Sequence, residues 1–249
     1  MKKIKFLSVA IILSTVFAVS CNKDDNNSLS EEYITEEVAD DIAASLGTDN
    51  SGLSSEITDV AELSDTYNDK SQNMLTDTLY SVDTSFSITN PEGTLITYSY
   101  TYHMEYGYVL SDNKLDNIYY NGDVNGSFDA PRIGSSDNRT SNWIMTGLDV
   151  SSSEYNINGT SQRNGSSQSK IRNKSTINTT SQISVSNVKV NKSTLMITEG
   201  TLNYQLSGDV NGQSFNYSAI VTYSGNGEAE LSINGMNYTI NITTGEIEE

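Results

Sequence analysis

The side chain with the clearest chemical role in this 249-residue sequence is its only cysteine, Cys21. It follows a basic segment at residues 1–5 and an apolar run at residues 6–19. A basic segment, an apolar segment and small residues at a cleavage point are typical, in that order, of a secretion signal. A thiol at this point is where a diacylglyceryl group would be attached before the signal is removed. We therefore predict that residues 1–20 are a lipoprotein signal peptide and that Cys21 carries the lipid.

Two alternatives explain the same segment without a lipid. The first is a transmembrane helix, but the apolar run of about fourteen residues is shorter than the roughly twenty that a span requires. The second is an ordinary secretion signal followed by a coincidental cysteine. That alternative would leave an unpaired thiol in an oxidising compartment, which secreted proteins normally avoid.

The residues after the cysteine resemble the tether of Bacteroidota-type lipoproteins, and positions 21–27 read Cys-Asn-Lys-Asp-Asp-Asn-Asn. In that group, a lysine followed by two acids resembles a surface-export signal. The resemblance implies an export signal at Lys23, Asp24 and Asp25, and a lipid-anchored protein of the outer membrane, displayed at the cell surface. The alternatives are a tether that the two acids merely solvate, and a location on the periplasmic face.

His103 is the only histidine, so a Ser-His-Asp or Cys-His nucleophilic site would have to be built on it. Strand alternation puts it opposite a row of tyrosines, on the polar side of the sheet, with Thr97, Ser99, Thr101 and Glu105. A histidine among hydroxyl groups on a polar face is usually only solvated. We predict no catalytic residue and expect that the protein is not an enzyme.

The sequence also predicts no cofactor and no metal site. One histidine and one cysteine are too few ligands for the usual zinc site, and the glycines punctuate hairpins rather than form a phosphate-binding loop. Residues 112–116 contain neighbouring acids but lack the spaced oxygens and the glycine of a calcium loop. Calcium bound by scattered Asp and Asn side chains, and a carboxylate pair from distant strands, stay open at this point.

The formal net charge is −18, and it becomes more negative if the basic signal segment is removed. This charge argues against binding to nucleic acid, which needs clustered Lys and Arg. It also argues against electrostatic adhesion to anionic lipid, so the expected membrane contact is the acyl anchor on Cys21.

The charges are unevenly distributed along the chain. Between Cys21 and Leu75 there are fourteen acids and two bases, whereas eight bases accompany three acids between Arg132 and Lys192. We expect the basic stretch to dock the acidic N-terminal segment. The alternative ligand for the basic stretch is an anionic glycan or a lipid head group.

After a tether at residues 21–28, the pattern predicts an acidic helical segment at residues 29–72. Ser28 and Glu31 have the spacing of a capping box, and Gly47 is a suitable C-cap. The apolar residues between these caps lie on one helical stripe: Ile34, Val38, Ile42 and Leu46. A second, weaker helix starts near Ser54. Both helices are too short and too polar to be stable alone, so they need a surface to cover.

From residue 73 to residue 249 the apolar period is two, which is typical of strands with one wet face. The pattern is clearest in two regions. Residues 96–108 form one long, tyrosine-rich strand, and the C-terminal part of the chain forms a meander of strands. Weaker strands are expected near 142–150, 154–162 and 174–190, with residues 164–167 as the tip of a hairpin.

We therefore predict an α+β fold in which two short N-terminal helices pack on a large twisted antiparallel β-sheet of eight to ten strands, flat or curled into a half-barrel. The tyrosines from Tyr98 to Tyr108 are expected to be core beneath the helices, or a platform for a glycan or lipid if exposed. The expected function is that of a cell-envelope lipoprotein acting as a surface binding or structural module. The alternative is a half-barrel that carries a lipid or a lipoprotein in a hydrophobic cavity.

Overall fold

The computed structural model describes residues 28–70, 80–90, 93–112 and 114–248. Two helices, α1 (Glu31–Leu46) and α2 (Leu53–Lys70), precede a single antiparallel sheet. Its strands are β1 (Tyr80–Thr89), β2 (Thr97–Ser111), β3 (Lys114–Asp129), β4 (Ile133–Thr146), β5 (Glu154–Ser169), β6 (Thr176–Asn191), β7 (Ile197–Val210), β8 (Gln213–Gly225), β9 (Glu228–Ile233), β10 (Met236–Asn241) and β11 (Glu246–Glu248).

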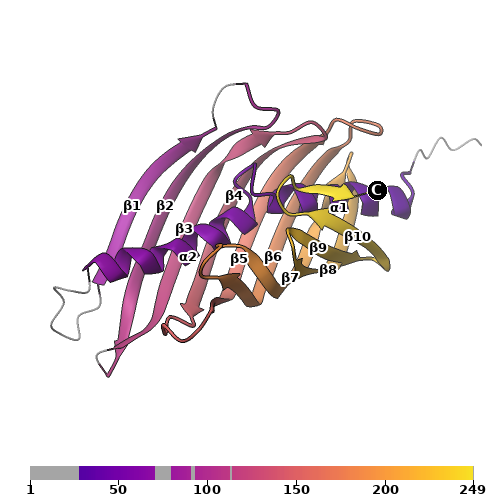
Figure 1. Ribbon diagram of the computed structural model, residues 1–249. Coiled ribbons are helices and arrows are strands. Elements are labelled where there is room, and N and C mark those ends of the chain that lie inside the picture. Colours follow the sequence, from indigo (N-terminus) through magenta and orange to yellow (C-terminus); the bar gives the residue numbers. More distant parts are fainter. Residues whose placement is uncertain (1–27, 71–79, 91–92, 113, 249) are drawn as a thin grey trace, which may run out of the picture.

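The sheet is a simple meander, in which each strand pairs with the next one along the chain. The prediction of a large antiparallel sheet with two helices is confirmed, although the sheet has eleven strands rather than eight to ten. It stays open, with β1 and β11 as its edges. Strands of 13 to 16 residues from β2 to β8 make this sheet long, and it curls around the helices (Figure 1).

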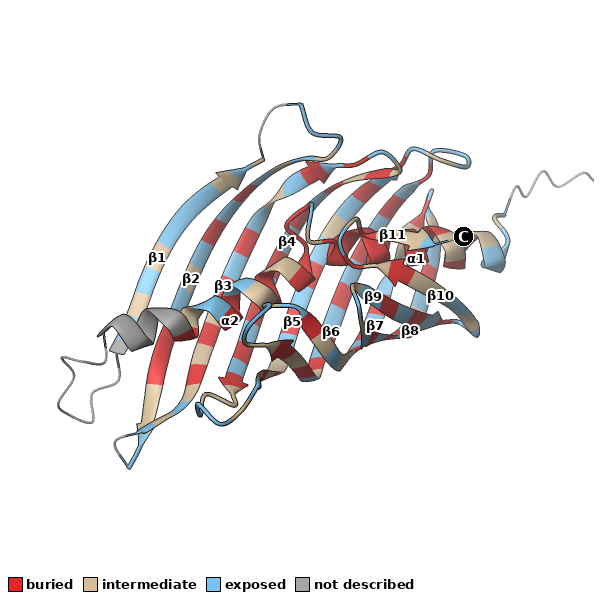
Figure 2. Cartoon of the chain, in the orientation of Figure 1, coloured by how far each residue is buried: buried red, intermediate tan, exposed pale blue. Residues whose placement is uncertain are grey.

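Both helices lie across the same face of the sheet, which we call the inner face (Figure 1). Burial alternates along the central strands, so that inward side chains are buried and outward ones are mostly exposed (Figure 2). The outer face carries mainly Ser, Thr, Asn and Gln, as expected for a sheet with one wet face. The core is therefore the layer between the inner face and the two helices.

Helix α1 begins two residues later than its capping-box pattern indicates. Ser30, not Ser28, is the N-cap, and its hydroxyl accepts a hydrogen bond from the Tyr33 amide at 3.2 Å. The predicted end at Gly47 is confirmed. A side chain at this glycine would meet the backbone of Gly245 at 2.9 Å, so glycine allows the C-terminal turn to pack against the helix end.

One of the weaker strand predictions has the wrong bounds, and the prediction of a hairpin tip is wrong. The strand expected at residues 142–150 is β4, which starts at Ile133. The expected hairpin tip at residues 164–167 lies inside β5, paired on both sides. In both strands the inward positions hold polar residues, such as Asp137 and Arg163, so the alternation of apolar and polar residues is lost from the sequence.

Within the described part of the chain, neither helix has the length and apolar character needed to cross a membrane.

Candidate functional site

The predicted lipidation and export residues, Cys21 and Lys23 to Asp25, lie outside the described residues. The described domain starts close behind them, and its first residues are held firmly. The Gln213 side chain accepts a hydrogen bond from the Leu29 amide at 2.7 Å and donates one to the Leu29 carbonyl at 3.0 Å. The chain therefore enters the domain beside the hairpin between β7 and β8, and the predicted tether ends there.

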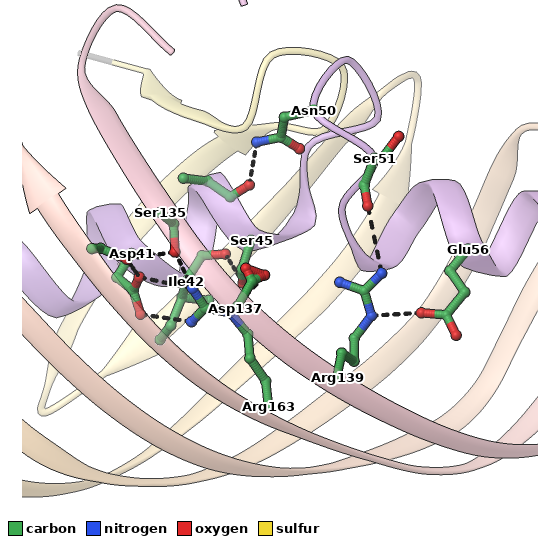
Figure 3. Close-up of polar contacts among 12 residues, drawn as sticks. Asp41, Ile42, Ser45, Asn50, Ser51, Glu56, Ser135, Asp137, Arg139 and Arg163 are labelled. Atoms are coloured by element: carbon green, nitrogen blue, oxygen red, sulfur yellow. Dashed lines mark hydrogen bonds and ion pairs between the residues drawn. The ribbon is translucent and has the colours of Figure 1, made fainter. Parts of the chain in front are cut away.

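A buried ion pair joins α1 to the centre of the sheet (Figure 3). The guanidinium of Arg163 on β5 donates to both carboxylate oxygens of Asp41, at 2.9 and 3.1 Å. Ser167 also donates to Asp41, and Asp137 lies 3.5 Å from the Arg163 Nε. Burial by itself would raise the pKa of Asp41, but the charge and hydrogen bonds of Arg163 outweigh it and hold that pKa below its ordinary value.

A second buried pair joins α2 to β4. The Arg139 Nε donates to Glu56 at 2.5 Å, and the Tyr120 hydroxyl donates to the other oxygen of Glu56 at 3.0 Å. Arg139 and Glu56 are 2% and 1% exposed, so neither charge has water to solvate it and each depends on the other.

A third basic residue, Arg172 in the hairpin between β5 and β6, contacts three acids of α1. Its Nε lies 3.2 Å from Glu36, and one Nη lies 3.3 Å from Glu37 and closer to Asp40. Together with the two buried pairs, these contacts confirm that the basic stretch docks the acidic helical segment.

Four of the tyrosines from Tyr98 to Tyr108 are core, as predicted, whereas Tyr98 is only partly buried. Tyr100, Tyr102, Tyr106 and Tyr108 are at most 6% exposed. Several hydroxyl groups bridge sheet and helices: Tyr108 donates to the Leu63 carbonyl at 3.0 Å, and the Tyr223 and Ser54 hydroxyls lie 3.0 Å apart. A tyrosine supplies both an apolar ring for the core and a polar tip for the helix that covers it.

His103 lies on the outer face near the β1 edge, as the alternation predicts. Its Nδ1 is 3.0 Å from the Ser85 hydroxyl and 3.5 Å from Asp83. A nucleophilic triad needs the serine on one ring nitrogen and the carboxylate on the other. Here both partners face the same nitrogen, and the imidazole is half-exposed, so the arrangement is that of a solvated surface cluster.

A hollow of about 620 Å³ opens at the end of the sheet between Asn90, Leu95, Tyr98 and the turn before β11. A smaller hollow of about 270 Å³ lies where α2 crosses the first three strands. We call this smaller space the α2 hollow. It combines acidic and aromatic side chains, and its lining is Glu56, Asp59, Val60, Glu62 and Leu63 of α2, Phe86 of β1, Tyr102 and Met104 of β2, and Tyr120 of β3.

The electrostatics of the α2 hollow are dominated by carboxylates. Asp59 is a solvent-exposed residue, but partial desolvation beside the sheet, then repulsion from Glu62 and Glu56, raises its pKa to about 6. Burial also raises the pKa of Tyr102 to about 12, so its hydroxyl stays protonated. A carboxyl group with a raised pKa in a concave site is a physical indicator of a functional site.

No group of three His, Cys, Asp or Glu side chains in the described residues is arranged to hold a metal ion. This applies also to the three acids of the α2 hollow, whose carboxylates do not form such a group. No local sequence pattern indicates this hollow, because its residues come from four elements and only the sheet register brings them together.

Comparison of the chain with models of protein families, with characterised proteins and with solved structures finds no match.

Proposed function

We propose that this chain is a cell-envelope lipoprotein, held in the outer membrane by acyl chains on Cys21 and displayed at the cell surface as a binding or structural module. The observation that carries the proposal is the single cysteine placed directly after a basic and apolar leader. The fixed position of Leu29 supports it, because the domain then begins only eight residues after Cys21. Those residues can span at most about 30 Å, which keeps the domain close to the membrane surface.

The packing between helices and sheet supports a module rather than a carrier. A carrier needs a continuous apolar cavity of several hundred Å³ beneath the helices. Most of that space instead holds buried tyrosines and the Arg139 and Arg163 ion pairs, and the α2 hollow that remains is lined by acids as well as aromatic rings. Separating the helices from the sheet would expose these charges without their partners, so the interface favours a rigid body.

Lipid or lipoprotein carriage by a half-barrel is the second candidate function. The observation in its favour is the 620 Å³ hollow beside Leu95 and Tyr98, which opens at the end of the sheet rather than beneath the helices. Mass spectrometry of organic extracts from the purified protein tests it. A stoichiometric non-covalent lipid would favour the carrier.

The anchor is tested by growing cells that express the chain with labelled palmitate. We expect the wild-type protein and a Ser28→Ala control to incorporate label and to sediment with membranes. We expect Cys21→Ala to remain unlabelled and soluble. A Cys21→Ala protein that stays membrane-bound would refute the proposed anchor.

Surface display is tested separately by protease treatment of intact cells. The wild-type protein should be digested without permeabilisation. Replacing Lys23, Asp24 and Asp25 by alanine should protect it, while labelling with palmitate is retained. Protection of the wild-type protein would instead indicate the periplasmic face.

A further inference from the structure

We propose that the α2 hollow is a binding site for an alkylammonium group, supplied either by a free diamine or by a lysine side chain of another protein. The proposal names a ligand class for the binding module proposed above. It does not depend on the lipid anchor, so its test can fail while the anchor is established, and the reverse.

The acids of the hollow include two that the fold leaves available. Glu56 is neutralised by Arg139. Asp59 and Glu62, one turn apart on α2, have no ion-pair partner within 4.0 Å among the described residues. Elsewhere on the helices, Asp41 and the acids of the Arg172 cluster are each paired with a base from the sheet. The two unpaired carboxylates therefore provide negative charge for a cation from outside.

The wall opposite these carboxylates is aromatic. Phe86 and Tyr102 stack with ring centroids 5.1 Å apart and planes within 2°. Phe86 lines the hollow and is 41% exposed, so its ring is accessible to a ligand. Aromatic faces attract organic cations, and the half-buried Met104 adds a polarisable apolar surface for methylene groups.

Tyr102 contributes its ring, not its hydroxyl, to this wall. Its side chain is 4% exposed and its hydroxyl oxygen is fully enclosed. Ser51, which does not line the hollow, interacts with this hydroxyl and lowers its pKa, against the larger effect of burial. A ligand in the hollow would therefore contact the aromatic ring of Tyr102.

Size and charge exclude the main competing ligands. A space of about 270 Å³ admits an ammonium group with a short alkyl chain, but not a folded domain or a long acyl chain. Anions would be repelled by Asp59 and Glu62. Divalent metal ions are disfavoured because the acids do not form a ligand group.

The single tryptophan offers a direct measurement on the full chain. Trp143 is 1% exposed and stacks on Tyr120, with centroids 5.3 Å apart, and Tyr120 lines the hollow. We would titrate the full chain, purified in non-ionic detergent, with 1,5-diaminopentane and with N-acetyl-lysine amide. Trp143 fluorescence and calorimetry would be followed, with 1-pentanol and glutarate as neutral and anionic probes.

We expect saturable binding of at least one amine and none of the neutral or anionic probes. Tighter binding of the diamine would identify a small-molecule ligand, and tighter binding of the lysine amide would identify a protein side chain. Asp59→Asn and Phe86→Ala should each weaken binding by about fivefold or more. Asp83→Asn is the matched control, because Asp83 is an exposed acid of β1 on the outer face, and it should bind like the wild type.

The proposal would be overturned if neither amine saturated the protein by about 10 mM. A dissociation constant above that concentration corresponds to a binding free energy too small for specific binding. Equal affinity of Asp59→Asn and the wild type would also overturn it, provided that both proteins show the same circular dichroism.

Binding should also depend on pH. Since the pKa of Asp59 is about 6, affinity should rise between pH 5 and pH 7 as this carboxyl loses its proton. Among the side chains that the structure describes, the other ionisable groups near it come from α2, β2, β3 and β4: Glu56, Glu62, Tyr102, Tyr120 and Arg139. Asp59→Asn should remove most of the pH dependence in this range.

Discussion

Arg163 and Asp41 lie 122 positions apart in the chain and form a two-pronged ion pair, with N–O distances of 2.9 and 3.1 Å, at the centre of the interface between α1 and the sheet. Both side chains are at most 4% exposed. Such a pair does not by itself stabilise a protein more than apolar residues would, but removing one partner leaves a charge buried without compensation.

Replacing Asp41 by alanine should therefore lower the free energy of unfolding by about 3–5 kcal/mol. Chemical denaturation measures the effect. A double-mutant cycle with Arg163→Ala should give a coupling energy above about 1 kcal/mol, because each single change leaves the other group unpaired. The same cycle on the exposed pair of Lys189 and Glu199 is the control, and its coupling should stay below about 1 kcal/mol. Equal coupling in the two cycles would contradict the assignment of a buried pair.

The N-cap of α1 can be tested with two serines that differ in one structural respect. The Ser30 hydroxyl accepts a hydrogen bond from the Tyr33 amide, whereas Ser28 lies two residues before this N-cap. Ser30→Ala should cost about 1 kcal/mol of stability, because an amide of the first turn loses its acceptor. Ser28→Ala should stay within about 0.5 kcal/mol of the wild type. The reverse order would mean that the helix starts at the earlier serine.

Asp59 should make stability depend on pH in the sense opposite to Asp41. Its pKa is about 6 in the folded protein and 3.8 as an ordinary carboxyl, so the folded state takes up the proton more readily. The ionised carboxylate thus opposes folding above pH 6, and this penalty disappears as the pH falls towards 3.8. Asp59→Asn should raise the melting temperature at pH 7.5, and the gain should fade by pH 4. A gain of equal size at both pH values would indicate a cause other than this titration.

Gly208 on β7 should not tolerate a side chain. A Cβ at this position would overlap the Asn178 carbonyl oxygen and would lie 3.0 Å from the Phe215 ring. Gly208→Ala should destabilise the fold by about 1–3 kcal/mol in a thermal or denaturant unfolding experiment. Gly134→Ala is a suitable control, because its nearest neighbour is the end of the Asp129 side chain, which can move. Similar losses in both variants would show that the contact with Asn178 does not limit this position.

Much of this fold can be predicted from local patterns. The four-residue spacing of Ile34, Val38 and Ile42 predicts α1, and all three side chains are at most 3% exposed. The meander from β7 to β10 follows from alternating apolar residues and from the Asn-Gly turns at 211–212 and 234–235. These features were predictable because each depends on residues close together in the sequence.

The first half of β4 and the second half of β5 were not predictable in the same way. Their inward side chains include Asp137, Arg139 and Arg163, and a polar residue on both faces removes the period of two. The two arginines can point inward because Glu56 of α2 and Asp41 of α1 meet them there, and Asp137 faces Arg163. The two helix acids lie more than eighty positions away along the chain.

The sequence by itself determined that an acidic helical segment precedes an antiparallel sheet, and it supplied the only chemical argument for Cys21 as a lipid attachment site. Only the tertiary structure decided which charges pair and which remain available. Arg139 and Arg163 select Glu56 and Asp41, while Asp59 and Glu62 are left facing aromatic rings in the α2 hollow. The physical reason is that periodicity reports which way a side chain points, whereas pairing depends on the sheet register and on where each helix crosses it.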